Sequence, residues 1–277
     1  MSAVALGALL LGSCGGRPAR PVVSAPAPGP PASASLAVDR KCGAGERQAV
    51  GPYVYVNNQW GSGKVPAGQP FEQCLLSRTV GGWPQHGWSF RWPGHDPSVF
   101  AYPEIIFGWT PWGGGESSDP RFPMPVRDMP ALEMTYAVES VIEGHFNLAP
   151  EVWLVRTGGD GPRRPSDIAT EIMFWLDYDE TMRPAGSVVA TVTVDGVAYD
   201  LYKAEGGNEK ASWTYLAYVG PRGRSAGSLR LDAFIRDAVA RGYASEAHHL
   251  AGVEFGNECA GGDGTTWVTR YEVRVGR

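Results

Sequence analysis

Apolar and polar residues alternate over many short segments of the sequence, a period that is typical of half-buried β-strands. Residues 188–194 and 197–202 alternate in this way on either side of Asp195-Gly196, a dipeptide that favours the two-residue turn of a β-hairpin. Residues 53–58, 132–141, 152–156, 171–178, 213–219 and 267–275 are also predicted to form strands, and the last of them alternates clearly between Trp267, Thr269, Tyr271, Val273 and Val275 on one face and Arg270, Glu272 and Arg274 on the other. Together these segments favour an all-β fold.

One segment follows a helical period instead. Residues 229–241 carry apolar side chains at helical spacing, with Ser228 as the expected N-terminal cap and Gly242 as the expected C-terminal cap. Many strands and a single helix predict a two-sheet antiparallel sandwich with one packed helix.

Composition supports this fold class and excludes one class of partner. The 277 residues are 43% hydrophobic, enough to bury one large core, and the 37 glycines and 23 prolines suit many tight turns. The net charge is −5 and no basic stripe is present. We therefore expect no nucleic-acid partner, because phosphate binding needs clustered Lys and Arg.

The first residues predict export. Residues 1–14 form an apolar run that is too short to span a bilayer and that is typical of a signal peptide. Its end, Leu11-Gly12-Ser13-Cys14, resembles a bacterial lipobox, in which Cys14 is lipidated; an ordinary secretory signal is the alternative. We expect a secreted or lipid-anchored protein at the bacterial cell surface, with membrane contact only through Cys14. Residues 15–36 are rich in Pro and Ala and predict an extended linker, so residues 37–277 form the expected globular domain.

The predicted strand 171–178 separates carboxyl groups from the core. Side chains alternate along a strand, so Ile172, Phe174, Leu176 and Tyr178 are expected on one face. The opposite face then carries Glu171, Met173, Trp175 and Asp177. Acids beside a Trp are typical of a sugar-binding cleft, whereas the competing interpretation is an exposed strand with an incidental Trp.

A second acidic segment, residues 252–264, contains Glu254 and Glu258. Glycosidic hydrolysis needs one carboxylate at the anomeric carbon and one carboxylic acid that protonates the leaving oxygen. Acids on separate strands of one curved sheet can meet in this way. Taken alone, the segment is equally consistent with a Gly-rich turn that carries solvated acids.

At these residues the chain resembles glycoside hydrolase family 12, the small endoglucanases and xyloglucan hydrolases. Four motifs carry the resemblance in the right order, and together they span most of the chain after Cys42: Asn57-Asn58-Gln59-Trp60-Gly61, Tyr102-Pro103-Glu104-Ile105-Ile106-Phe107-Gly108, Glu171-Ile172-Met173-Phe174-Trp175 and Phe255-Gly256-Asn257-Glu258.

The resemblance implies a jelly-roll sandwich with an open cleft, and an enzyme that cuts β-1,4-glucan with retention of configuration and without metal or cofactor. It assigns Glu171 as the nucleophile and Glu258 as the acid/base. The resemblance also implies that Trp60 is a platform for a sugar ring and that Asn58 is a polar cleft residue beside it. It implies that Met173 and Trp175 line the cleft near the cut and that Pro184 belongs to a loop on the leaving-group side.

Two positions depart from the family pattern. An Asp near the nucleophile is replaced by Glu151, which we expect to share a proton or hydrogen bond with Glu171. The residue after the acid/base is Cys259, where Pro is common. Cys42 and Cys74 flank the first strand region and match a family disulfide, which leaves Cys259 as a free thiol.

Glu254 competes with Glu258 for the role of proton donor. Glu258 occupies the Glu of the family motif, lies beside a Gly-rich segment where a strand is expected to end, and would have its pKa raised by the charge of Glu171. Glu254 is therefore interpreted as a hydrogen-bonding residue of the cleft.

Two alternatives are weighed, the first of them from another class. A non-catalytic carbohydrate-binding sandwich needs the aromatic cleft but no paired glutamates. An unrelated sandwich glucanase, the second alternative, usually carries its acids close together on one strand, whereas Glu171 and Glu258 are 258 − 171 = 87 positions apart, which fits family 12. His248 and His249 are adjacent and point in different directions, so a shared metal is not expected. The preferred polysaccharide among cellulose-type chains, mixed-linkage glucan and xyloglucan is undecided by the sequence, and we expect a monomer.

Overall fold

The computed structural model describes residues 37–94, 99–112, 116–158, 165–208 and 211–276. The expected signal peptide, the lipidation of Cys14 and the linker of residues 15–36 lie outside the described residues. No helix among the described residues is both long enough and apolar enough to cross a bilayer.

Strands make up most of the domain, with a single α-helix, α1 (Leu231–Ala240), among the described residues. The strands are β1 (Val38–Lys41), β2 (Arg47–Val50), β3 (Tyr53–Val56), β4 (Glu72–Val80), β5 (Trp83–Trp92), β6 (Glu104–Gly108), β7 (Met124–Pro125), β8 (Leu132–Val155), β9 (Ile168–Trp175), β10 (Asp177–Tyr178), β11 (Ser187–Val194), β12 (Val197–Asn208), β13 (Ala211–Val219), β14 (Ala226–Arg230) and β15 (His249–Val275). Three short 3₁₀ turns are also present in this part of the chain: Ser62–Lys64, Val126–Asp128 and Pro165–Asp167.

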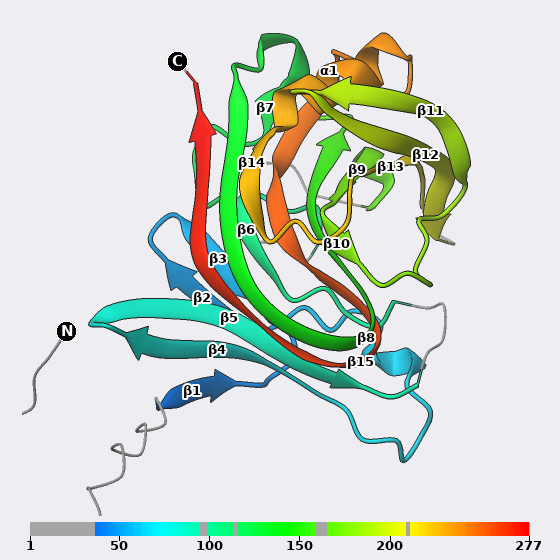
Figure 1. Cartoon of the computed structure of the whole chain (residues 1–277). Coiled ribbons are helices and arrows are strands. Elements are labelled where there is room, and N and C mark those ends of the chain that lie inside the picture. Colours follow the sequence, from blue (N-terminus) through cyan, green and yellow to red (C-terminus); the bar gives the residue numbers. More distant parts are fainter. Residues whose placement is uncertain (1–36, 95–98, 113–115, 159–164, 209–210, 277) are drawn as a thin grey trace, which may run out of the picture. The chain divides into compact units, whose positions relative to one another are not determined.

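Two long antiparallel strands, β8 and β15, run side by side through both layers of the sandwich (Figure 1). The first layer has the order β1-β4-β5-β15-β8-β14, and it uses the C-terminal half of β15 and the N-terminal half of β8. The second layer has the order β2-β3-β6-β15-β8-β9-β13-β12-β11, and it uses the other halves. The predicted all-β jelly-roll sandwich is confirmed, but its two sheets are one hydrogen-bonded sheet that bends over.

The bend is made where glycines of the two long strands face one another. Gly144 (φ +128°) pairs with Gly262 (φ +94°), and a Cβ atom on Gly262 would lie 2.1 Å from the carbonyl oxygen of Glu143. The register shifts here, between Cys259 and Gly261. The expectation that a strand ends at this Gly-rich segment is wrong, because glycine lets the strand continue through the bend at a close approach of two backbones.

The antiparallel pattern has one exception. Strands β9 and β13 pair in parallel, with Glu171 opposite Tyr215 and Met173 opposite Ala217. The predicted purely antiparallel arrangement is therefore wrong at this pair, and the β9–β13 connection instead passes through the hairpin of β11 and β12.

The core fills the space between the layers and extends under α1. Phe234 of α1 packs against Phe174 of β9 and Tyr218 of β13, with ring centroids 4.9 Å apart in each case. The helix therefore covers the face of β9 and β13 that is opposite to Met173 and Trp175. The expected Ser228 cap is wrong, since Ser228 belongs to β14 and the helix begins after Arg230; Gly242, at φ +73°, follows the C-terminal end as expected.

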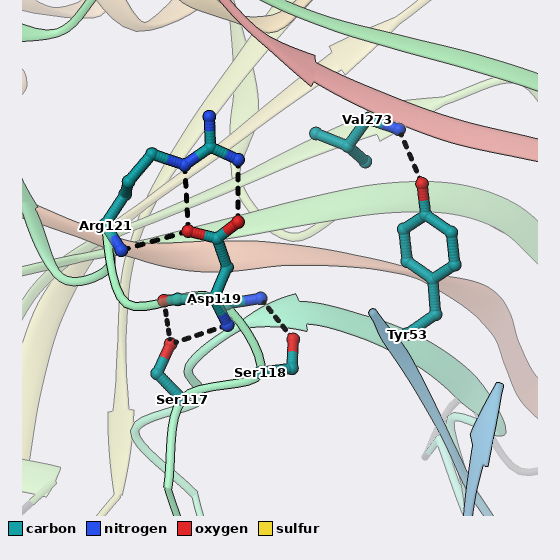
Figure 2. Close-up of polar contacts among 7 residues, drawn as sticks. Tyr53, Ser117, Ser118, Asp119, Arg121 and Val273 are labelled. Carbon is teal, nitrogen blue, oxygen red and sulfur yellow. Dashed lines mark hydrogen bonds and ion pairs between the residues drawn. The ribbon is translucent and has the colours of Figure 1, made fainter. Parts of the chain in front are cut away.

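A hydrogen-bonded turn closes the long connection between β6 and β7. The carboxylate of Asp119 accepts two hydrogen bonds from the Arg121 guanidinium, at 2.8 and 2.6 Å, and the Ser117 hydroxyl donates to the Asp119 carbonyl (Figure 2). The Ser118 hydroxyl accepts from the backbone N–H of Gly108 at 2.9 Å, which fixes the turn to the end of β6. This closure anchors the loop that carries Trp112.

Candidate active site

Four glutamates lie on four adjacent strands and on one face of the second layer. They are Glu104 on β6, Glu254 on β15, Glu151 on β8 and Glu171 on β9, and we call them the carboxyl row. Glu254 and Glu151 are direct cross-strand partners, whereas each of the other neighbouring pairs is offset by two residues. Three of the four side chains are almost fully buried, and only Glu171 is partly exposed. Four charges at this spacing, three of them buried, would repel one another strongly, so the row must hold protons.

Two hydrogen-bond donors contact the carboxyl group of Glu171. The indole N–H of Trp213 donates to Glu171 Oε2 at 2.5 Å, and the carboxyl group of Glu151 is also hydrogen-bonded to Glu171. Burial raises the pKa of Glu171 to about 8, and these two donors offset part of this rise by favouring the charged form. Burial and the neighbouring charge of Glu171 raise the pKa of Glu151 well above its usual range, so Glu151 is the partner that keeps the proton.

Glu258 lies on β15 opposite Asn147 of β8 and is held by that residue from two sides. The side-chain amide of Asn147 donates to Glu258 Oε2, and its oxygen accepts the backbone N–H of Glu258 at 3.2 Å. Burial raises the pKa of Glu258 to about 7, and the Asn147 hydrogen bond partly offsets this rise. The sequence predicted a raised pKa from the charge of Glu171; the direction agrees, but burial is the cause.

A pocket of about 570 Å³ opens beside Glu258. Its walls include Trp175 and Pro184, both predicted cleft residues, together with Tyr215 and His145. His145 is fixed at the rim, because its Nδ1 lies 2.7 Å from the Thr181 hydroxyl and 3.1 Å from the Asp179 carboxylate. We call this the catalytic pocket.

A second pocket, of about 590 Å³, shares a wall with the catalytic pocket. Trp175, Met182, Arg183 and Pro184 line both. The second pocket extends over β12 and the turn after β10, where Tyr178, Tyr202, Asp200 and Arg222 line it. We call it the distal pocket, and it lies toward the edge of the sheet that is opposite to β3 and Trp60.

Three tryptophans pack edge to face beside the carboxyl row. The rings of Trp112, Trp153 and Trp213 are 5.2 to 5.8 Å apart, centroid to centroid. Trp213 donates to Glu171, and Trp153 donates to Glu254 at 3.1 Å. One aromatic cluster therefore orients two carboxylates of the row.

The two residues expected at the start of the cleft occupy different settings. Asn58 is partly buried and donates to Glu104 Oε1 at 2.9 Å, so its side chain is directed at the carboxyl row. Trp60 is 58% exposed, and the ammonium group of Lys64 lies 4.4 Å from the ring centroid. An exposed flat ring at the edge of the cleft is available for stacking on a sugar.

The predicted assignment of side chains to the two faces of strand 171–178 is correct as far as Trp175 and fails at Tyr178. Met173 and Trp175 lie on the face of Glu171 as expected, and the hydroxyl of Tyr215 lies 3.5 Å from the sulfur of Met173. Tyr178 was expected in the core, but its ring packs against Trp175 at 5.6 Å. The alternation breaks because β9 ends at Trp175 and the chain bends before β10.

Glu254 was expected to hydrogen-bond in the cleft. The structure places it in the carboxyl row, only 2% exposed, where it contacts Glu104 and Trp153. The disulfide between Cys42 and Cys74 is present, and Cys259 is a buried free thiol. The cluster of potential metal ligands found in the described part of the chain consists of these two bonded cysteines and Glu72.

Sequence reasoning missed Trp213, Asn147, Trp153 and the role of Glu104. Asn147 lies four residues before Glu151, and Trp153 lies two residues after it. Alternation along one continuous strand would therefore have placed all three side chains on the same face. That signal was lost because β8 was predicted as two separate strands. Trp213 begins a strand that was predicted, but no pattern in the sequence pairs it with Glu171.

Comparisons with known proteins agree on one family. Residues 51–275 match the sequence model of glycosyl hydrolase family 12. Endoglucanase S of Pectobacterium parmentieri is 27% identical over 229 residues, which cover 80% of this chain and 81% of that protein. Xyloglucan-specific endo-beta-1,4-glucanase A of Emericella nidulans is 27% identical over 240 residues, which cover 84% and 90% of the two chains.

Solved structures show the same fold. A family 12 xyloglucanase from Bacillus licheniformis has a TM-score of 0.76 at 24% identity, over 86% of this chain and all of that chain. Endoglucanase cel12A from Rhodothermus marinus has a TM-score of 0.70 at 28% identity, over 86% of this chain and 99% of that chain.

Proposed function

Since the chain belongs to glycosyl hydrolase family 12, we propose that it is a retaining, endo-acting hydrolase of β-1,4-glucan. The observation that carries this proposal is the different setting of two glutamates on β9 and β15, the two strands that flank β8. Glu171 receives two hydrogen bonds that favour its anion, from Trp213 and Glu151, whereas Glu258 lies beside the pocket and is held by the Asn147 amide. Such a pair supplies the nucleophile and the acid of a double displacement.

In the first step Glu171 attacks the anomeric carbon and the bond from that carbon to the leaving oxygen breaks. Glu258 gives its proton to the leaving oxygen, so the departing chain leaves as a neutral alcohol. The donors on Glu171 hold the carboxylate in position for attack, and Glu151 is the neutral donor among them.

In the second step Glu258, now a carboxylate, takes a proton from a water molecule. The water oxygen attacks the anomeric carbon, the bond to Glu171 breaks, and Glu171 leaves as a carboxylate. Asn147 serves both steps, because it holds Glu258 through the side chain and through the backbone N–H. Two inversions give a β product.

The open geometry supports cutting within a chain. Trp60 lies toward the β3 edge of the sheet, and the distal pocket lies toward the opposite edge, with the two catalytic glutamates between them. A polysaccharide can therefore extend past the cut in both directions, with Trp175 near the cut and Pro184 on the leaving-group side; both residues line the pocket beside Glu258. Names of relatives include both endoglucanases and xyloglucan-specific enzymes, so the substrate is placed among unbranched and branched β-1,4-glucans.

Three further parts of the proposal come from the sequence. We propose export, with Cys14 as the lipidation site if the chain is anchored, and a monomer that acts on polysaccharide outside the cell. The relevant residues, 1–36, lie outside the described part of the chain. A non-catalytic carbohydrate-binding sandwich is less well supported, because binding alone needs neither a buried acid nor a carboxylate with two donors.

The test separates Glu258 from its competitor Glu254. Glu258→Ala should nearly abolish hydrolysis of a natural glucan, but it should spare glycosylation by an aryl glycoside whose leaving group is already acidic. Added azide should restore turnover of the aryl glycoside and give a β-glycosyl azide. Proton NMR of the first wild-type product should show the β anomer.

The matched control is Glu254→Gln, which should show no dependence of the loss on the leaving group. If Glu254→Gln shows that dependence and Glu258→Ala does not, the acid/base assignment is wrong. An initial α product would refute the retaining mechanism.

A further inference from the structure

Two oxygens inside the carboxyl row lack a donor. Glu104 Oε2 and Glu254 Oε1 are buried without a donor group, although the two carboxyl groups are in hydrogen-bonding contact with each other. Two carboxylates cannot bond each other, because an ionised carboxylate only accepts. One proton must therefore lie between Glu104 and Glu254.

The remaining partners decide which residue carries this proton. Burial raises the pKa of both residues, that of Glu104 well above its usual range. Glu254 accepts hydrogen bonds from the Trp153 indole and from the Thr110 hydroxyl, both of which favour its anion and offset part of this rise. Glu104 accepts one, from the Asn58 amide. The pair is thus a neutral Glu104 that donates to a Glu254 carboxylate.

The Glu254 carboxylate faces Glu151 directly across the β15–β8 ladder. Directly opposed side chains on one face have Cβ atoms about 4.5–5.5 Å apart. Both residues are buried, at 2% and 5% exposure, so the repulsion between two anions here would be screened very little. The negative charge of Glu254 therefore disfavours ionisation of Glu151.

We propose that Glu254 is a positioning residue whose buried carboxylate keeps the shared proton of the Glu151–Glu171 pair on Glu151. The four members of the row then alternate as acid, anion, acid and anion, from Glu104 to Glu171. The two anions are separated by a neutral residue, and the nucleophile is always offered a donor. This inference rests on the proposed function, because it assigns Glu171 as the nucleophile.

Other titratable groups face this pair from every side. Arg47 of β2 is the cation that acts on both Glu104 and Glu254, and Tyr102 and Tyr271 are neutral phenols whose pKa is raised by burial. Glu171, Glu258 and Tyr215 lie on the cleft side. Glu254 acts on Glu171, and Glu258 acts on Glu151 and Glu171. Tyr215 is a neutral phenol whose pKa is raised by burial and by Glu258, Glu171 and Glu151. None of these groups replaces Glu254 as the cross-strand partner of Glu151.

The experiment measures kcat/KM against pH with an aryl glycoside that has an acidic leaving group. Such a substrate needs no proton from Glu258, so both limbs of the profile report the Glu151–Glu171 pair. Glu254→Gln keeps an oxygen for the Trp153 N–H but removes the charge. Both limbs should move to lower pH by about 1 to 2 units, the size of a nearby-charge effect.

Two matched variants separate charge from structure. Glu254→Asp keeps the charge and should return both limbs toward their wild-type positions. Glu104→Gln keeps an acceptor for Asn58 and a donor for Glu254, so it should leave both limbs in place. In a Glu151→Gln background, where the donor to Glu171 is permanent, Glu254→Gln should cause no further shift of the basic limb.

Wild-type protein provides a readout that does not depend on any variant folding. Carboxyl ¹³C NMR should show Glu151 protonated and Glu254 ionised at neutral pH. The inference is overturned if Glu254→Gln lowers the rate without moving either limb, or if NMR finds Glu151 ionised and Glu254 protonated. A loss of the proposed function itself would appear differently, as wild-type protein that does not cleave the aryl glycoside.

Discussion

Trp213 is the donor on the nucleophile that the sequence did not reveal, and replacing it by Phe isolates one hydrogen bond. The indole N–H donates to Glu171 Oε2 at 2.5 Å, and a hydrogen bond to a charged group is stronger than one between neutral groups. Phe retains an aromatic ring against Trp112 and Trp153 but offers no donor. The expected effect is a less stable Glu171 carboxylate.

Its magnitude follows from the chemistry of the bond. A hydrogen bond to a charged group contributes about 1.5–3 kcal/mol, and each pKa unit corresponds to about 1.4 kcal/mol. Losing the Trp213 donor should therefore raise the pKa of Glu171 by about 1 to 2 units. Since attack requires the anion, kcat/KM at a pH below the acid limb should fall about 10- to 100-fold, while the plateau is retained.

The assay is kcat/KM for an activated aryl glycoside across the acid limb, with normalised profiles compared. Trp112→Phe is the control, because Trp112 packs against the same two rings but makes no hydrogen bond to a carboxylate that the structure shows. It should lower stability without moving the limb. Superimposable acid limbs for Trp213→Phe and the wild type would refute the role given to this donor.

Two further predictions concern the edge of the cleft and the start of the domain. Trp60→Ala should weaken productive binding of long glucans more than hydrolysis of a short activated glycoside, because stacking energy from a remote sugar ring is used at the reacting bond. The control is Trp83→Ala, at an exposed Trp on the β4–β5 hairpin, which should change neither activity. Equal losses on both substrates would make Trp60 a packing residue. Replacing Cys42 and Cys74 by Ser should lower the free energy of unfolding by about 3–4 kcal/mol, the value that the chain-entropy model gives for a loop of this length. A peptide map of the non-reduced protein that pairs Cys259 with either residue would contradict the assigned bond.

Strand periodicity predicted the elements of the fold well but not their continuity. Segments 132–141 and 152–156 are parts of one strand, β8, and 267–275 is the end of another, β15. The interruption seen in the sequence comes from Gly144 and Pro150, residues that usually end a strand. In this chain they lie where the sheet bends and where a long neighbouring strand supplies the pairing, which no local pattern reports.

The site was predictable only where its chemistry is carried by a motif. Glu171 and Glu258 were identified from short motifs, and alternation correctly placed Met173 and Trp175 on the face of Glu171. The donors to these acids come from other strands, at positions fixed by register between distant segments. Register depends on bulges and bends, so Trp213 was not predictable as the partner of Glu171 from the sequence.

The motif Phe255–Glu258 shows how alternation divides stability from chemistry within four residues. Phe255 and Asn257 point into the core, where Phe255 stacks on Tyr271 with centroids 5.5 Å apart. Asn257 accepts hydrogen bonds from Trp88 Nε1 and the Thr266 hydroxyl, both at 2.9 Å, and donates to a backbone carbonyl of β8. These contacts fix the strand from behind.

Gly256 and Glu258, which alternate with Phe255 and Asn257 along the strand, face the cleft. A Cβ atom on Gly256 would lie 2.2 Å from the Pro103 carbonyl and 3.1 Å from Glu104 Cα, so only glycine lets β6 approach closely enough. That approach brings Glu104 within reach of Glu254, while Glu258 extends from the next outward position toward the substrate. The glycine of the motif is therefore required for the carboxyl row, and its replacement by Ala would separate Glu104 from Glu254 before it disturbed Glu258.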